Sequence, residues 1–259
     1  MSTHNAELYA CAAVVVGSGW QVVAALAPVT SRPYTAAGPV NPVRGVIAAW
    51  ARKPVVTAAV LAVTVVMVVL QYAVPGLQAD LMREPDALHD GQWWRMFTAL
   101  FIQSSGLVQI AINLPALFAV GAIAEWVIGP WRWLVVYFGS GLAANYASLL
   151  GWSPHGGGSS VAICGLVGAL VMLCAIWGSS SVTIPPQIRF TGLLVPVAGV
   201  FLCCIRNNHG VGLVCGSVLG LVIAFLSRPS SLHIGQGPVL SSTSRRASHS
   251  PDFSDSDEP

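Results

Sequence analysis

A serine and a histidine are the residues of this 259-residue chain whose types and settings could support nucleophilic chemistry. Ser160 follows a glycine run in "HGGGSSVAICG", and His209 begins the segment "HGVGLVCGSVLG". A serine hydroxyl is a weak nucleophile until a neighbouring base takes its proton, and one histidine within hydrogen-bond reach is sufficient. The two residues therefore suggest attack on a carbonyl group, provided that the fold brings them together.

Such an attack places negative charge on the carbonyl oxygen, and hydrogen-bond donors must surround that charge. Gln109 and Asn113 lie at positions i and i+4 of one predicted helix, so their side-chain amides share a face. The backbone N–H groups at the start of a helix beginning at Ser160 provide further donors. We therefore expect Asn113 and Gln109 to support the transition state.

The composition indicates the environment in which these residues lie. Hydrophobic residues make up 54% of the chain and charged residues only 8%, whereas a soluble domain carries about 25% charged residues. This composition predicts a multi-pass protein of the lipid bilayer. The twelve Lys and Arg residues form no basic stripe, so nucleic acid is not an expected partner. The six cysteines lie in apolar runs without paired spacing and are predicted to be small buried hydrophobic residues, with no metal or cofactor.

Apolar segments predict an all-α fold with six transmembrane helices, because about 20 apolar residues cross the hydrocarbon core. The predicted spans are Val55–Ala73, Ser104–Val127, Trp133–Leu150, Ser160–Trp177, Thr191–Ile205 and His209–Leu226. If the amino end of the first span is cytoplasmic, nine of the twelve Lys and Arg residues lie on the cytoplasmic side. This agrees with the positive-inside rule and places both ends of the six-helix core in the cytoplasm.

The chain divides into three predicted regions. Residues 1–53 form a cytoplasmic or membrane-associated segment, residues 54–228 form the membrane domain, and the polar residues 229–259 form a disordered cytoplasmic tail. The apolar run Leu8–Ala27 is compatible with a seventh helix, a membrane-surface helix or a targeting segment. The first eight residues lack Lys and Arg, which argues against a signal peptide, and we favour an extra N-terminal helix.

Glycine spacing predicts how Ser160 and His209 meet. Small residues on facing stripes let two membrane helices approach closely, and such stripes follow both residues: Gly165, Gly168, Gly212, Gly216 and Gly220. Each feature has a simpler explanation when taken alone. A serine in an apolar helix usually bonds to a carbonyl one turn earlier, and a histidine at a helix start can simply face the membrane interface. Their joint occurrence on helices of compatible topology favours function.

These motifs together resemble the rhomboid family of intramembrane serine proteases, over roughly residues 54–228. "GQWWRMFTALF" resembles the Trp-Arg motif of the family, "QIAIN" its HxxxN, "GSSVAICGLVGA" its GxSG with a following glycine pair, and "HGVGLVCG" its His-x-x-Gly-x-x-x-Gly. The stretch "GAIAEWVIGPWRW" is similar to the segment between them. The resemblance assigns structural roles to Trp94, Arg95, Glu125, Arg132, Gly158, Gly165, Gly212 and Gly216.

The resemblance implies a serine-type endopeptidase with a bundle of six helices. Its reaction would be hydrolysis of a peptide bond in or near a transmembrane segment of a single-span membrane-protein substrate. Ser160 would act as nucleophile and His209 as base and then acid, in a dyad without an aspartate. Cys164 is an alternative nucleophile because "AICG" also resembles GxSG, but the preceding "HGGG" and the later glycines favour Ser160.

Departures from the family pattern support a second hypothesis, a catalytically impaired rhomboid-like protein that binds transmembrane helices for trafficking or degradation. Gln103 and Gln109 replace histidines, Val161 replaces a glycine and is expected to crowd the sixth span, and Cys164 replaces an aromatic residue. A transporter or channel fits poorly, because the chain shows no inverted repeat and few intramembrane charges. Glu125 is expected instead to anchor the inner loop through Arg132.

The sequence favours a secretory-pathway or plasma membrane over a mitochondrial one. Residues 1–30 contain no arginine, whereas a mitochondrial leader is amphipathic and rich in arginine.

Overall fold

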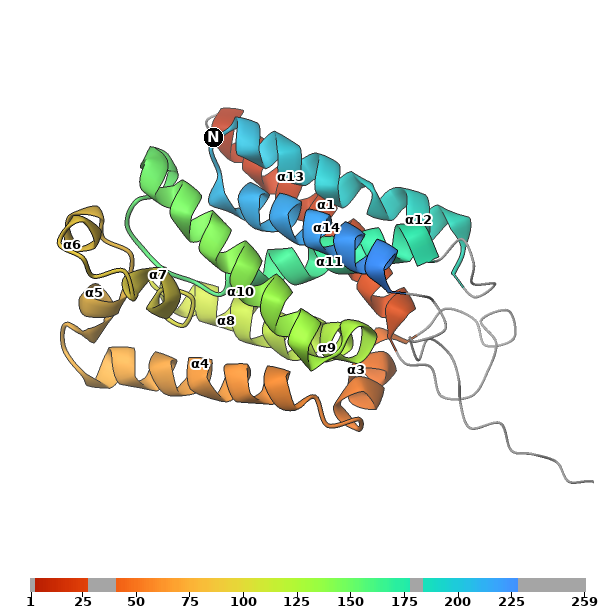
Figure 1. Ribbon diagram of the computed structural model, residues 1–259, viewed down its shortest axis with the longest axis horizontal. Coiled ribbons are helices and arrows are strands. Elements are labelled where there is room, and N and C mark those ends of the chain that lie inside the picture. The colour runs from red at the N-terminus through yellow and green to blue at the C-terminus, as the bar shows by residue number, and fades with distance from the viewer. Residues whose placement is uncertain (1–2, 28–40, 178–183, 228–259) are drawn as a thin grey trace, which may run out of the picture.

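The computed structural model describes residues 3–27, 41–177 and 184–227, and Figure 1 shows them as a bundle of helices. Within those ranges the regular elements are helical, and extended pairing is confined to an isolated antiparallel bridge between Arg83 and Gly156. The predicted all-α fold is therefore confirmed. The predicted tail 229–259 lies outside the described residues.

Six helices of the described ranges are long and apolar enough to cross a membrane, as predicted. They are α4 (Val55–Ala73), the continuous span Leu107–Ile128 (α8, Leu107–Ala116; η1, Leu117–Gly121; α9, Ala122–Ile128), α10 (Pro130–Ala147) extended by η2 (Ser148–Trp152), α11 (Ser160–Trp177), α12 (Pro186–Gly192) with α13 (Leu194–Cys204), and α14 (Asn208–Leu226). The protein is thus an integral multi-pass membrane protein. Shorter helices are α3 (Pro42–Trp50), α5 (Leu77–Leu81), α6 (Pro85–His89) and α7 (Arg95–Thr98).

Four spans differ in extent from the prediction. The third covers Pro130–Trp152 rather than Trp133–Leu150, and the sixth begins one residue earlier, at Asn208. The second begins at Leu107 rather than Ser104, because Gly106 adopts a positive φ of 76° that ends the preceding turn. The fifth begins five residues earlier than predicted, at Pro186, and is divided into α12 and α13 at Leu193. Pro196 has no N–H to donate to the carbonyl of Gly192 four residues earlier, which explains the break at that point.

The predicted extra N-terminal helix is present as α1 (Thr3–Leu26). It packs against α11, α12 and α13 (Figure 1). Val22 and Val23 are completely buried by this packing, and Gly19 lies so close to α11 that a Cβ there would come within 2.8 Å of Val167. The helix is therefore a seventh member of the bundle.

Helix α11 lies at the centre of the molecule and packs most extensively on α14 (Figure 1). The predicted glycine stripes form this contact. A Cβ at Gly220 would lie 2.5 Å from the Cα of Ala169, and a Cβ at Gly216 would clash with the backbone of Gly165. Only hydrogen atoms fit between the two backbones at these positions, so the predicted close approach of the fourth and sixth spans is confirmed.

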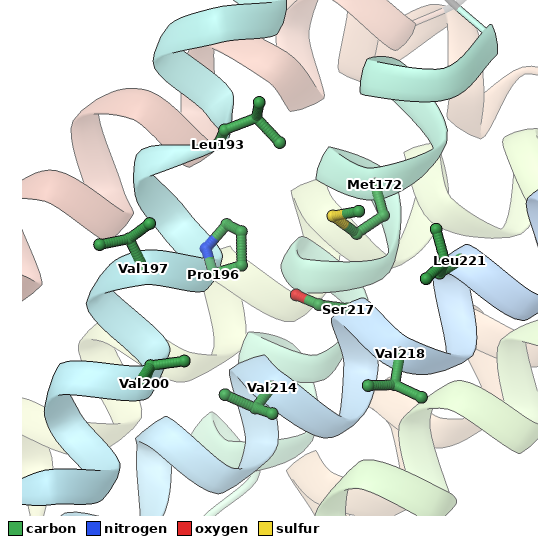
Figure 2. Close-up of a pocket in the computed structure, with 9 residues that line it drawn as sticks. All are labelled: Met172, Leu193, Pro196, Val197, Val200, Val214, Ser217, Val218 and Leu221. Carbon is green, nitrogen blue, oxygen red and sulfur yellow. The ribbon is translucent and has the colours of Figure 1, made fainter.

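An apolar cavity of about 360 Å³ lies between α11, α13 and α14 (Figure 2). Ser217 supplies a hydroxyl in this otherwise apolar lining, and its Oγ has no partner. The cavity is lined by Met172, Leu193, Pro196, Val197, Val200, Val214, Ser217, Val218 and Leu221. It does not include Ser160 or His209.

None of the six cysteines is in a disulfide, which agrees with the prediction. Cys11 and Cys174 are buried, and Cys164, Cys203 and Cys215 are partly buried. Cys204 is exposed, so its predicted burial was wrong. It is the last residue of α13, where the helix turns one face away from the bundle.

Candidate active site

Ser160 and His209 meet at one end of the contact between α11 and α14. The Ser160 Oγ lies 2.9 Å from the His209 Nε2, a hydrogen-bond distance, although 49 residues separate the two positions. Ser160 is the first residue of α11 and His209 the second of α14, so the glycine-mediated packing of the two helices fixes their separation. This is the geometry required of a serine nucleophile and its base.

Asn207 holds the other side of the imidazole ring, and the sequence analysis did not identify it. Its Oδ1 accepts the backbone N–H of His209 at 3.0 Å and lies 2.9 Å from the ring Nδ1. An oxygen that accepts from the ring requires a proton on Nδ1, which leaves Nε2 free to accept the hydroxyl proton of Ser160. The sequence signal was its position as an asparagine N-cap immediately before α14.

The glycine run before Ser160 passes through a space that admits no side chains. A Cβ at Gly157 would lie 2.7 Å from the carbonyl oxygen of Ala99, and one at Gly158 would clash with the Gln109 Nε2. The N–H of Gly158 donates to that same Ala99 carbonyl at 2.8 Å. The run therefore has to be glycine for the chain to reach Ser160 along this path.

The two predicted oxyanion residues lie in different settings. Gln109 lines the cavity beside Ser160, and its Nε2 donates to the carbonyl of Gly157 at 3.1 Å. Asn113 is buried outside that lining, and its Nδ2 donates to the Gln103 Oε1 at 2.7 Å. Gln109 is therefore the better placed of the two to reach a substrate oxygen.

Gln103 is the centre of a buried polar network. From the sequence, Gln103 was noted only as a departure from the family pattern. Its Nε2 donates to the Ser159 Oγ at 3.3 Å, and its backbone N–H and carbonyl both bond to the side chain of Gln71. The network links α4 and α8 to the residue preceding Ser160. It gives Gln103 a structural role next to Ser160.

The cavity at this site measures about 130 Å³. It is lined mainly by polar residues from the loops at this end of the bundle: Arg83, Ser104, Ser105, Gln109, Ser153, His155, Gly156, Gly157, Gly158, Ser160, Val161, Asn208 and His209. The predicted topology places this end on the outer side of the membrane. A polar cavity at the end of membrane helices can admit water to the serine.

Residues 90–230, more than half of the chain, match the Rhomboid domain. The chain belongs to the rhomboid family.

Two similar rhomboids carry protease names. The rhomboid protease GluP of Bacillus subtilis is 34% identical over 90 residues, which are 34% of this chain and 17% of that protein. The rhomboid-type serine protease 2 of Emericella nidulans is 36% identical over 103 residues, which are 40% of this chain and 18% of that protein. The matches therefore span less than a fifth of either relative. A rhomboid protein of Schizosaccharomyces pombe that is named as mitochondrial is 31% identical over 62 residues, 24% of this chain and 16% of that protein.

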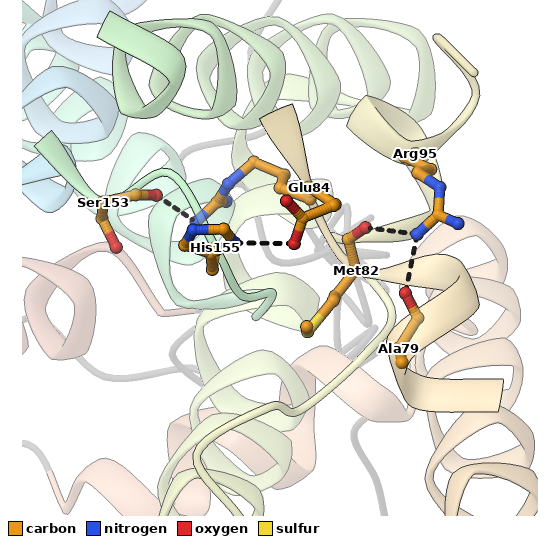
Figure 3. A network of polar contacts seen from close by, with 7 residues as sticks. Ala79, Met82, Glu84, Arg95, Ser153 and His155 are labelled. Atoms are coloured by element: carbon orange, nitrogen blue, oxygen red, sulfur yellow. Dashed lines mark hydrogen bonds and ion pairs between the residues drawn. The ribbon is translucent and has the colours of Figure 1, made fainter. Parts of the chain in front are cut away.

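Arg95 of the Trp-Arg motif braces the loop between the first two spans of this rhomboid. Its Nη1 donates to the carbonyls of Ala79 at 2.6 Å and Met82 at 3.3 Å (Figure 3), and its Nε donates to the Gln92 Oε1 at 2.7 Å. Trp94 instead is 55% exposed. The structure thus gives Arg95 partners consistent with its predicted structural role, whereas the Trp94 ring lies at the surface.

Glu125 is anchored differently from the expectation. Its two carboxylate oxygens accept the backbone N–H groups of Val56 at 3.0 Å and Thr57 at 2.7 Å, while Arg132 is exposed. The expected link through Arg132 was wrong. The carboxylate instead caps the amino terminus of α4, where free N–H groups and the helix dipole favour a negative charge.

Val161 and Cys164 do not displace the histidine. The Val161 side chain packs beside Leu100 and Ala144, and its carbonyl lies where a Cβ of Gly212 would clash. Because Gly212 has no side chain, α14 has room beside the Val161 backbone, and the expected crowding does not occur. Cys164 is a free thiol one turn below Ser160, and the His209 Nε2 is bonded to the Ser160 Oγ.

Arg83 lines the cavity that contains Ser160, and it was not predicted as a site residue from the sequence. It is 97% buried, forms the bridge to Gly156 through its backbone, and donates through its guanidinium to the Asn145 Oδ1 and the Ser153 carbonyl. Burial lowers the pKa of Arg83 to about 10, so its side chain stays charged at neutral pH. Its sequence signal was weak, because only the fold places it opposite the glycine loop.

Proposed function

We propose that this rhomboid is an intramembrane serine endopeptidase that cleaves peptide bonds in or near the transmembrane segments of single-span membrane proteins. The observation that carries the proposal is the 2.9 Å hydrogen bond between Ser160 Oγ and His209 Nε2 inside a polar cavity. The family membership and the protease names of two relatives support the same reaction class.

The proposed reaction begins with the Ser160 hydroxyl donating to His209. As Oγ attacks the scissile carbonyl carbon, Nε2 takes the proton, and the resulting imidazolium keeps its Nδ1–H bond to Asn207. The C–N bond then breaks as Nε2 returns the proton to the leaving amine. A water molecule, activated by the same nitrogen, hydrolyses the acyl-enzyme and restores Ser160.

Gln109 is the proposed side-chain donor to the oxyanion. Its Nε2 lies on the wall of the cavity beside Ser160 and bonds to the carbonyl of Gly157 in the glycine loop. Exchange of that loop carbonyl for the substrate oxyanion keeps the amide satisfied throughout the reaction. Asn113 contributes indirectly, through Gln103 and Ser159.

The direct test is cleavage of a fluorescent single-span substrate in liposomes by the purified protein, with Ser160→Ala as the matched control. A panel of substrates with unstable helices is used because the substrate is unidentified. We expect cleavage by the wild type and none by the variant. Equal cleavage by both proteins, or no cleavage of any substrate by a folded wild type, contradicts the proposal.

A further inference from the structure

Arg83 is the one permanently charged side chain that lines the cavity containing Ser160 and His209. The cavity measures only about 130 Å³, so a substrate side chain that enters it next to Ser160 comes close to the other residues that line the cavity. An arginine is strongly hydrated in water, and its transfer into a protein interior costs several kcal/mol unless partners compensate. The location of this charge therefore requires an explanation.

The partners that the fold gives to Arg83 are neutral. Its Nη1 and Nη2 donate to an amide oxygen of Asn145 and a carbonyl of Ser153. Its Nε is buried and has no partner. Within the described residues the carboxylates form one ion pair, between Glu84 and His155 at 2.7 Å (Figure 3), so none neutralises Arg83. A buried guanidinium with donors to spare and no anion fits a binding site for an anion.

Arg95 provides an internal contrast in the same loop. It too is buried, but carbonyls of Ala79 and Met82 and the amide of Gln92 take its N–H groups, and it does not line the cavity. A loop brace therefore needs no access to the nucleophile. Arg83 both braces the loop, through its bonds to Asn145 and Ser153, and lines the cavity.

We propose that Arg83 binds the carboxylate of an acidic residue that flanks the cleaved bond at the outer membrane boundary of the substrate. This inference rests on the proposed protease function and specifies the substrate class of the same site. The planar guanidinium matches a carboxylate through two parallel N–H···O bonds. Arg83 thus selects Asp or Glu over Asn or Gln beside the scissile bond.

Binding of two single-span peptides to the Ser160→Ala protein in nanodiscs tests this inference without requiring turnover. The peptides are identical except for Asp or Asn, which is placed in turn at each outer juxtamembrane position. We expect the Asp peptide to bind about 10- to 100-fold more tightly at one or two positions, because charge-assisted hydrogen bonds replace neutral ones. Arg83→Gln is expected to abolish this preference, Arg83→Lys to lower it, and the matched control Arg95→Gln to leave the Asp/Asn ratio unchanged.

Equal affinities for the two peptides at every position overturn the inference, even if Arg83→Gln fails to fold. A preference for Asp that survives both Arg83→Gln and Arg83→Lys also overturns it, since the carboxylate then binds elsewhere. Cleavage by the wild type is scored separately. If the wild type cleaves no substrate, the protease proposal is contradicted. The ratio of the Asp and Asn peptide affinities still decides whether Arg83 binds a carboxylate.

Discussion

Helices α11 and α4 have similar lengths and apolar sequences but are held in the molecule by different forces. Thirteen of the 18 residues of α11 are buried, and its glycines place its backbone directly against α14. Only four of the 19 residues of α4 are buried, and three of these are polar: Thr57, Thr64 and Gln71. Close packing therefore holds the central helix α11, whereas hydrogen bonds near the two ends of α4 hold that peripheral helix.

The difference bears on function because the proposed nucleophile lies on the tightly packed helix. A catalytic pair must keep its geometry to within a fraction of an ångström, and closely packed backbones resist displacement more than a few hydrogen bonds from side chains do. Helix α4 is attached at one end through Glu125 and at the other through Gln71 and Gln103. Substitutions in the two regions should therefore differ in kind and in size.

The largest expected effect is loss of the dyad at the end of α11. Ser160→Ala and His209→Ala should each lower turnover by about 10⁴-fold or more, because residues that act as one unit lose nearly the whole effect singly. Cleavage in liposomes measures this, with Cys164→Ala as a neighbouring variant that should retain activity. Loss of cleavage in Cys164→Ala combined with activity in Ser160→Ala would assign the nucleophile to the cysteine.

The second effect separates the two amides that the sequence analysis treated alike. Gln109→Ala should lower kcat by about 10²- to 10³-fold, the size seen for loss of an oxyanion donor. Asn113→Ala should have the smaller effect of the two, because Asn113 acts only through Gln103. The measurement is kcat for both variants on one substrate, and a larger loss for Asn113→Ala contradicts the assignment.

Asn207 should matter because it orients the imidazole. Asn207→Ala is expected to lower kcat by about 10- to 100-fold, since a displaced base costs rate steeply. Asn207→Asp keeps an oxygen for both N–H groups of His209 and should recover most of the activity. An equal loss of kcat in the two variants would contradict an orienting role and indicate that Asn207 is needed only for folding.

The contrast between packing and peripheral attachment is tested by adding the same kind of bulk to each helix region. Gly216→Val should lower the free energy of unfolding by about 1–3 kcal/mol or more, because the added carbon meets the backbone of Gly165. Ala62→Val on the exposed face of α4 should stay within about 0.5 kcal/mol of the wild type. Denaturation in bicelles measures both, and similar losses would remove the distinction between the helices.

A smaller loss of stability than that of Gly216→Val is expected where Glu125 caps α4. Glu125→Gln retains one acceptor and loses the charge, so it should destabilise the protein by about 1 kcal/mol, as expected for a weakened helix cap. Hydrogen exchange should then quicken at Val56 and Thr57 while protection in α11 is unchanged. Equal exchange changes in both helices would show that α4 is coupled to the core more tightly than its contacts indicate.

The spans and the proximity of Ser160 to His209 could be predicted from the sequence because their signals are local. The apolar runs defined α4 and α11 at their observed bounds, and the glycines after His209 indicated which helix faces meet. The bond of Glu125 to the start of α4, the separation of Gln109 from Asn113 and the place of Arg83 depend on tertiary contacts between distant segments. No local pattern encodes those contacts. Asn207 lies between these cases, since its N-cap position was visible but its bond to the ring was not.

The most direct test of the central claim, that α11 and α14 hold Ser160 and His209 as a reactive pair, is covalent labelling with a fluorophosphonate. The reagent phosphonylates a serine hydroxyl that a neighbouring base activates, and mass spectrometry of peptides from the full-length protein in detergent locates the adduct. The account predicts modification at Ser160 that disappears in a folded His209→Ala variant. Modification of a different residue, or of Ser160 to the same extent without His209, would contradict it.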